Sequence, residues 1–150
     1  MLFTIKERGL DLTIAALATY RGRFRDYNDF LVREIEPELK DQFTKCFNTK
    51  GFGKWAQLDA DTIEAKSKGG RVVTPLIDTG RYRRACENLK GKTLGKNSIK
   101  IVSPISYAIF HEFGTKDIPP RPVFELVANR MRRKVRKLYR EYNRRQTRGL

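Results

Sequence analysis

The single histidine of this chain, His111, is the residue best suited to acid–base or metal chemistry, and Glu112 follows it directly. A zinc site of the HExxH type requires a second histidine one helical turn later on the same face, but position 115 is a threonine. A nucleophilic triad would need a serine at a sharp strand-to-helix turn, and no such motif surrounds Ser106. We therefore predict no catalytic residue, no metal site and no cofactor, and expect His111 to be a structural, hydrogen-bonding residue.

Other residues that could take part in phosphate binding or catalysis are explained more simply by local structure. The glycines in 51–54 and 69–70 lack the rest of a phosphate-binding loop. Asp59 and Asp61 are well placed to cap a helix, which accounts for them better than acid–base catalysis does. One enzymatic alternative stays open: a small basic RNase toxin, in which Arg, Lys, Tyr and His act together on a phosphate.

The positive charge of the chain is large and unevenly distributed. The formal net charge is +15, and the segment 130–150 holds ten Lys or Arg against Glu141 alone, a local net charge of 10 − 1 = +9. Such a block attracts DNA, RNA or an acidic protein surface, unless it is only a solvated helix face. The candidates for partner contact are Arg132, Arg133, Arg136, Lys137 and Arg140.

Length and composition predict one domain. A chain of 150 residues can bury one core of ordinary depth, and we assign residues 1–143 to it and 144–150 to a flexible basic tail. Cys46 and Cys86 are far apart in sequence and are expected to be buried thiols of a reducing cytoplasm. The first eight residues do not resemble a signal peptide, and no apolar run is long enough to span a membrane.

Apolar periodicity predicts helices packed with a small antiparallel sheet, an α+β fold. Expected strands cover 2–7 and 98–102, and a turn is expected at 91–95. Expected helices cover 10–20, 28–47, 59–66, 81–86 and 122–143. Pro37 falls inside the second of these and either kinks one helix, which we prefer, or separates two. Residues 107–110 could begin a strand or a helix.

The helix over 122–143 has the clearest pattern in the chain. Its apolar residues recur at intervals of three and four, at Phe124, Val127, Met131, Val135, Leu138 and Tyr142. This spacing places them on one side of a helix, while lysines and arginines fill the other sides. The sequence thus predicts a long, basic, amphipathic C-terminal helix.

Five short motifs occur in an order that resembles one known family. They are Trp55-Ala56-Gln57-Leu58, Thr62 with Lys66, Leu76-Ile77-Asp78-Thr79-Gly80-Arg81-Tyr82-Arg83, Tyr107-Ala108-Ile109-Phe110-His111-Glu112-Phe113-Gly114, and Pro119-Pro120-Arg121-Pro122-Val123-Phe124. Together they resemble the virion-morphogenesis, or tail-completion, family of Mu-like and P2-like long-tailed phages over roughly residues 28–128. Tyr82 and Pro120 depart from the family pattern, which has a leucine and a small residue there.

The resemblance implies a structural protein of the phage virion rather than an enzyme. Such a subunit would form or join a ring, expected to be a hexamer, at the head–tail junction through which DNA passes. Its partners would be copies of itself, adjacent connector, terminator or tail-tube proteins, and double-stranded DNA without sequence preference. It would be found in the host cytoplasm during assembly and then in the neck of the virion. A free, sequence-independent nucleic-acid-binding protein remains the alternative.

The motif residues are expected to support this role structurally. The resemblance assigns such roles to Trp55, Thr79, Gly80, Tyr107, His111 and Gly114. Tyr107, Phe110 and Phe113 are expected to add core area. Thr79-Gly80 is expected to support a helix entry at which the glycine accepts an unusual backbone angle. Arg121, between prolines, is expected to project from a stiff loop and pair with a carboxylate, either on a neighbouring subunit or within the chain.

Overall fold

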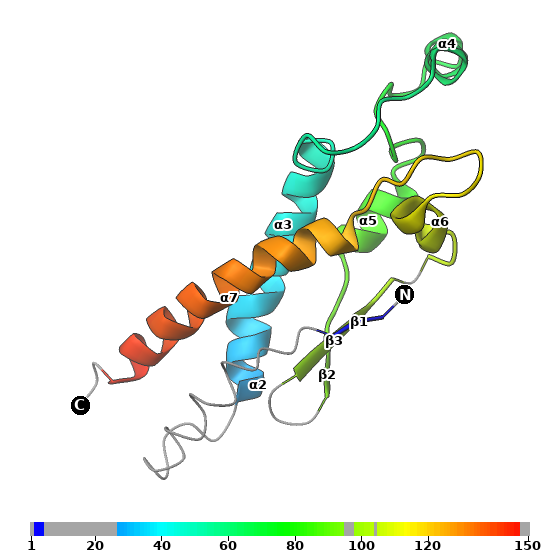
Figure 1. The fold of residues 1–150 in the computed structure, drawn as a ribbon. Helices are drawn as coiled ribbons and strands as arrows, with labels where there is room; N and C mark the ends of the chain where they lie inside the picture. The colour runs from blue at the N-terminus through cyan, green and yellow to red at the C-terminus, as the bar shows by residue number, and fades with distance from the viewer. Residues whose placement is uncertain (1, 5–26, 95–97, 104, 148–150) are drawn as a thin grey trace.

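The computed structural model describes residues 2–4, 27–94, 98–103 and 105–147 (Figure 1). Its helical elements are α2 (Tyr27–Phe30), the π-helical η1 (Leu31–Ile35), α3 (Glu36–Asn48), α4 (Ala60–Lys68), α5 (Arg81–Glu87), α6 (Ala108–Phe113) and α7 (Phe124–Thr147). Its strands are β1 (Leu2–Thr4), β2 (Lys92–Leu94) and β3 (Ser98–Val102). The helix predicted over 10–20 lies outside the described residues.

The elements α2, η1 and α3 form one continuous helix with a widened turn just before Pro37. The backbone N–H of Glu36 donates to the carbonyl of Leu31, a spacing of five residues. Proline has no N–H to donate, and its ring would press on the carbonyl four residues earlier. A π-helical turn at this point moves the carbonyls away from the ring. The preferred prediction, one helix distorted at Pro37, is therefore confirmed, although the helix begins at Tyr27 rather than at Asn28 or Asp29.

The core lies where α7 crosses this long helix (Figure 1). The ring centroids of Phe43 and Phe124 are 5.2 Å apart, and those of Phe30 and Tyr139 are 5.6 Å apart. The apolar stripe of α7 faces inward as predicted, with Phe124, Val127, Met131 and Val135 buried and Leu138 and Tyr142 partly buried. Each fully buried side chain of this kind contributes roughly 1.5–3 kcal/mol to folding.

The strands are short and contribute a minor part of the fold. They form an antiparallel sheet in the order β1-β3-β2, in which Leu2 is opposite Val102 and Lys92 is opposite Lys100. The turn predicted at 91–95 is wrong for Lys92–Leu94, which pair as a strand. The described chain is mostly helical, so the predicted α+β class is met only in part.

The C-terminal helix is longer than the sequence pattern suggests. It continues through Thr147, four residues beyond the predicted end at Asn143. In its last turns Arg145 pairs with Glu34 of η1 at 2.7 Å. A search of the described helices finds none that is long and apolar enough to span a membrane.

Residues 107–110 lead into a helix, α6, and its outer side is apolar. Ala108 and Glu112 are buried. Ile109, Phe110 and Phe113, by contrast, are 45%, 53% and 69% exposed. The prediction that Phe110 and Phe113 belong to the core is therefore wrong, and Tyr107, predicted with them, is also 36% exposed. Positions 108 and 112 are one helical turn apart and face inward together, so positions 109, 110 and 113 must face outward.

Candidate functional site

The motifs that are separate in the sequence meet around one groove. The groove has a volume of about 650 Å³, within the range typical of ligand and peptide sites. It is lined by residues 57–59, 62, 66, 76–82, 107, 111, 117–119 and 121. We call it the motif groove. All five sequence motifs contribute to its lining, which sequence spacing alone could not establish.

Lys66 holds one wall of the motif groove in shape. This lysine is buried, and its ammonium group donates to the backbone carbonyls of Val72, Thr74 and Ile77 at 3.2, 3.2 and 2.5 Å. Three carbonyl acceptors match the three N–H donors of an ammonium group. The lysine therefore serves the loop 71–78 rather than a ligand.

Arg121 joins two loops and does not project from the surface. Its Nε donates to the carbonyl of Ala56 at 2.8 Å, and its Nη2 to that of Gln57 at 2.7 Å. The side chain is only 7% exposed, and burial lowers the pKa of its guanidinium group. The prediction that Arg121 projects from the loop is wrong, and among the described residues it pairs with carbonyls rather than with a carboxylate. Its planar fork instead matches two successive carbonyls of a loop 64 and 65 residues away.

Trp55 fastens the same two loops at a second point. Its indole Nε1–H donates to the carbonyl of Pro122 at 2.7 Å, and its ring packs edge-on against Phe47. The ring also leaves no room for a side chain at Gly51, where a Cβ would lie 2.3 Å from the indole. These contacts anchor the loop of Trp55 to α3 and to the segment before α7.

Glu112 caps the long helix α7 from another element. One carboxylate oxygen accepts the backbone N–H groups of Val123 and Phe124 at 2.8 and 3.1 Å, and the other accepts that of Glu125 at 2.7 Å. The first N–H groups of a helix have no partner within it, and the helix dipole favours a negative charge there. The sequence offered no sign of this role, because the cap lies 11 to 13 residues before the groups that it binds.

The backbone requires a glycine at positions 114 and 80, because both have positive φ values. Gly114 has φ +76°, and a Cβ there would lie 2.8 Å from the carbonyl oxygen of Ile118. Gly80 has φ +73° and begins α5, beside Thr79, whose hydroxyl accepts the N–H of Arg81 at 3.4 Å. Both positive φ values are accessible to glycine without strain.

Three rings form the aromatic part of the groove lining. Tyr82, Tyr107 and His111 lie 5.7 to 6.0 Å apart, centroid to centroid. Burial, together with the nearby charge of Arg121, lowers the pKa of His111 below its usual value. The expected side-chain hydrogen bond is missing: Nδ1 has no partner among the described residues, and the local bond is made by the backbone carbonyl, which accepts the N–H of Arg121.

The exposed charges at the groove rim are mostly negative. Asp59 caps α4 by accepting the N–H of Thr62 at 2.7 Å, which lowers its pKa. Asp78 pairs with Arg71 outside the groove, and Asp117 has no ion pair among the described residues. The exposed cation of the lining is Arg81, because Lys66 and Arg121 are buried and bonded to carbonyls.

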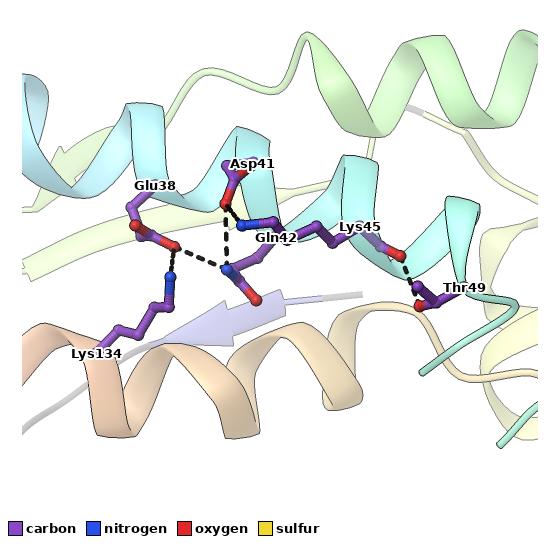
Figure 2. A network of polar contacts seen from close by, with 6 residues as sticks. All are labelled: Glu38, Asp41, Gln42, Lys45, Thr49 and Lys134. Atoms are coloured by element: carbon purple, nitrogen blue, oxygen red, sulfur yellow. Dashed lines mark hydrogen bonds and ion pairs between the residues drawn. The ribbon is translucent and has the colours of Figure 1, made fainter. Parts of the chain in front are cut away.

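The basic surface of α7 is the second candidate site. Lys134 is drawn inward to Glu38 of α3 at 2.5 Å, and Figure 2 shows Glu38 also accepting a hydrogen bond from Gln42. The predicted contact residues Arg132, Arg133, Arg136, Lys137 and Arg140 are exposed on the outer side of the helix. The structure thus gathers them on one surface, which we call the outer face of α7.

Neither cysteine is available for chemistry. Cys46 and Cys86 are free thiols buried between α3 and α5, as expected. Burial raises the pKa of Cys46 to about 12 and also raises that of Cys86. Within the described part of the chain, no three His, Cys, Asp or Glu side chains are grouped to hold a metal ion.

The chain is therefore a mostly helical protein in which five short sequence motifs build one groove, and its C-terminal helix is long and basic. No protein-family model matches it, and no solved structure does. It is 30% identical over 125 residues to the Uncharacterized protein MJ0331 of Methanocaldococcus jannaschii, and the match covers 79% of this chain and 92% of the archaeal protein. The chain belongs to the same family as this archaeal protein.

Proposed function

We propose that the chain is a structural subunit of the neck of a long-tailed phage particle, of the tail-completion type. It forms or joins a ring at the head–tail junction, through which DNA passes. The proposal starts from the resemblance of five motifs that occur in order. The observation that carries it is the set of contacts that the motif residues make within the chain. Trp55, Lys66, Gly80, Gly114 and Arg121 all shape loops, as expected of a subunit that assembles rather than catalyses.

Two unlike exposed surfaces also support an assembling subunit. One is the apolar side of α6, with Ile109, Phe110 and Phe113, and the other is the outer face of α7. Exposed aromatic side chains gathered on one helix are typical of interaction surfaces. Ring interfaces join two different patches of the same subunit, and this chain offers different patches on α6 and α7.

The proposal is tested by mass and by imaging. Light scattering on the purified protein, at low and high salt and with and without DNA, would give a discrete oligomer of about six subunits for a ring that forms by itself. Labelled protein should be located at the head–tail junction of assembled particles by electron microscopy. A protein that is absent from purified particles would contradict the proposal.

Sequence-independent nucleic-acid binding is a second candidate, favoured by the outer face of α7. Its cations could contact phosphates without reading bases. A monomer that binds DNA avidly and forms no ring would favour this function. The RNase alternative has less support, because Arg121, the charged neighbour of His111, already donates to two carbonyls.

A further inference from the structure

We infer that the motif groove is the receptor for the outer face of α7 of a second copy of this chain, in a head-to-tail contact. The inference rests on the proposed function, since it names the two surfaces that would join neighbouring subunits. On one side is a groove of about 650 Å³ with acidic side chains at its rim, and on the other is a helix with outward-facing arginines.

The groove has the shape and stiffness of a preformed site. Lys66 fixes one wall through three carbonyls, and Arg121 fixes another through two. Because the loops are already held by buried hydrogen bonds, little conformational entropy is lost when an occupant enters. Tyr107, 36% exposed, presents an aromatic ring over which a guanidinium group could stack.

The charges of the two surfaces are complementary. The rim carries the exposed carboxylates of Asp59, Asp78 and Asp117, and the exposed cation of the lining is Arg81. Asp59 also caps α4 and Asp78 also pairs with Arg71, whereas Asp117 has no ion pair among the described residues. On α7, Arg133 and Arg140 point away from the core. They are two helical turns apart, so both face the same side. An arginine that enters the groove can form a bidentate pair with an exposed carboxylate such as that of Asp117.

The geometry of one subunit excludes a contact within the same chain. The groove adjoins the beginning of α7, since Ile118, Pro119 and Arg121 line it just before Phe124. Arg133 and Arg140 follow Phe124 by 9 and 16 residues, or about 14 and 24 Å along an unbroken helix. Figure 1 shows the end of α7 directed away from α5 and α6. The arginines can therefore enter only the groove of another copy, and such a contact is heterologous and can close into a ring.

The experiment compares complementary charge reversals in the full-length protein by sedimentation equilibrium at low salt. The groove variant is Asp78→Lys with Asp117→Lys, and the helix variant is Arg133→Glu with Arg140→Glu. Each should weaken self-association about tenfold or more, as expected for a desolvated charge contact. Combining all four substitutions in one chain should restore association to within about threefold, because the charges then match again.

Controls separate the contact from loss of folding and from a change in net charge. Lys40→Glu with Lys90→Glu makes the same charge change as the helix variant on exposed positions away from both surfaces, and should leave association unchanged. Asp117→Asn is a milder groove variant, in case the lysine pair fails to fold. Thermal melting confirms that each variant is folded.

Three results would overturn the inference. These are a wild-type chain that stays monomeric at about millimolar concentration, reversals that leave association unchanged, or reversed variants that the four-fold swap does not rescue. If the chain is still found at the head–tail junction, only the contact is wrong. If the charge reversals weaken self-association and the four-fold swap restores it, but the chain is absent from particles, the contact is supported and the proposed function is wrong.

Discussion

Three buried charged residues connect segments of the chain that are not joined by backbone hydrogen bonds of a helix or sheet. They are Lys66, Glu112 and Arg121. All three bind backbone groups of a different segment, and they account for eight hydrogen bonds between loops and helix ends. A buried charge is costly unless it is fully hydrogen-bonded. Here each charge is satisfied by backbone dipoles, so removing one side chain should loosen an entire loop.

Glu112→Gln should destabilise the protein by about 2 kcal/mol, because it removes a negative charge that caps α7 and turns part of an acceptor group into a donor. The free energy of unfolding, measured by urea denaturation, would report the loss. Glu125→Gln is the matched control, since Glu125 is exposed in the first turn of the same helix. Equal losses in the two variants would contradict the capping role.

His111 should make stability depend on pH in the acid range. Its pKa in the folded protein lies below the unfolded value of 6.5, so below pH 6.5 the unfolded chain binds a proton that the folded chain resists. The stability that it contributes is complete above pH 6.5 and is lost as the pH falls. The urea midpoint should drop between pH 7.5 and 5.5, and it should drop less in His111→Gln. An identical drop in both proteins would refute this assignment.

Among the elements, the loop before α7 depends on one glycine. The chain reverses at Gly114 with φ +76° and ψ 178°, and the loop closes so tightly that any Cβ would meet backbone atoms. This region of backbone space is nearly restricted to glycine. The loop then positions Arg121, Glu112 and the start of α7 relative to one another.

Gly114→Ala should therefore lower the free energy of unfolding by about 3 kcal/mol, from backbone strain and steric overlap together. Gly53→Ala is a matched control, because Gly53 has a similar φ of +79° but open space around its Cβ position. It should cost only about 1 kcal/mol. Thermal denaturation of both variants would test the comparison, and equal costs would show that the steric contact is unimportant.

The positive charge of the whole molecule is concentrated toward the C-terminus. The segment 130–150 carries +9 of the +15 total, and part of that charge is balanced internally by Glu34 and Glu38. The remaining cations of α7 face outward on the side opposite the core. A surface of this kind contacts polyanions without sequence preference.

The free subunit should therefore bind a short DNA duplex of arbitrary sequence, with an affinity that falls steeply as salt rises. Arg133→Glu with Arg140→Glu should reduce the slope of log K against log salt by about two, one for each lost phosphate contact. Fluorescence anisotropy between 50 and 200 mM salt, about the range over which such contacts weaken, would measure it. The reversal of Lys40 and Lys90 should leave the slope nearly unchanged. An equal decrease of the slope in both double variants would show that only net charge matters.

Features that depend on near neighbours could be predicted from the amino-acid sequence. The apolar stripe of α7, the cap at Asp59 and the positive φ at Gly80 all involve residues within one or two helical turns, so spacing and residue type suffice to predict them. The distortion at Pro37 is local for the same reason. The motif residues Trp55, Gly80 and Gly114 were also identified, although their common location was not.

The packing of distant segments determines which polar groups are buried and what they bind, and this could not be predicted. Arg121 reaches carbonyls 64 and 65 residues away, and Glu112 caps a helix that starts 12 residues later. It also decided that Phe110 and Phe113 are exposed, because the short helix α6 uses its inward side for Ala108 and Glu112. Burial depends on which distant segments pack together, and residue spacing along the chain carries no record of that pairing.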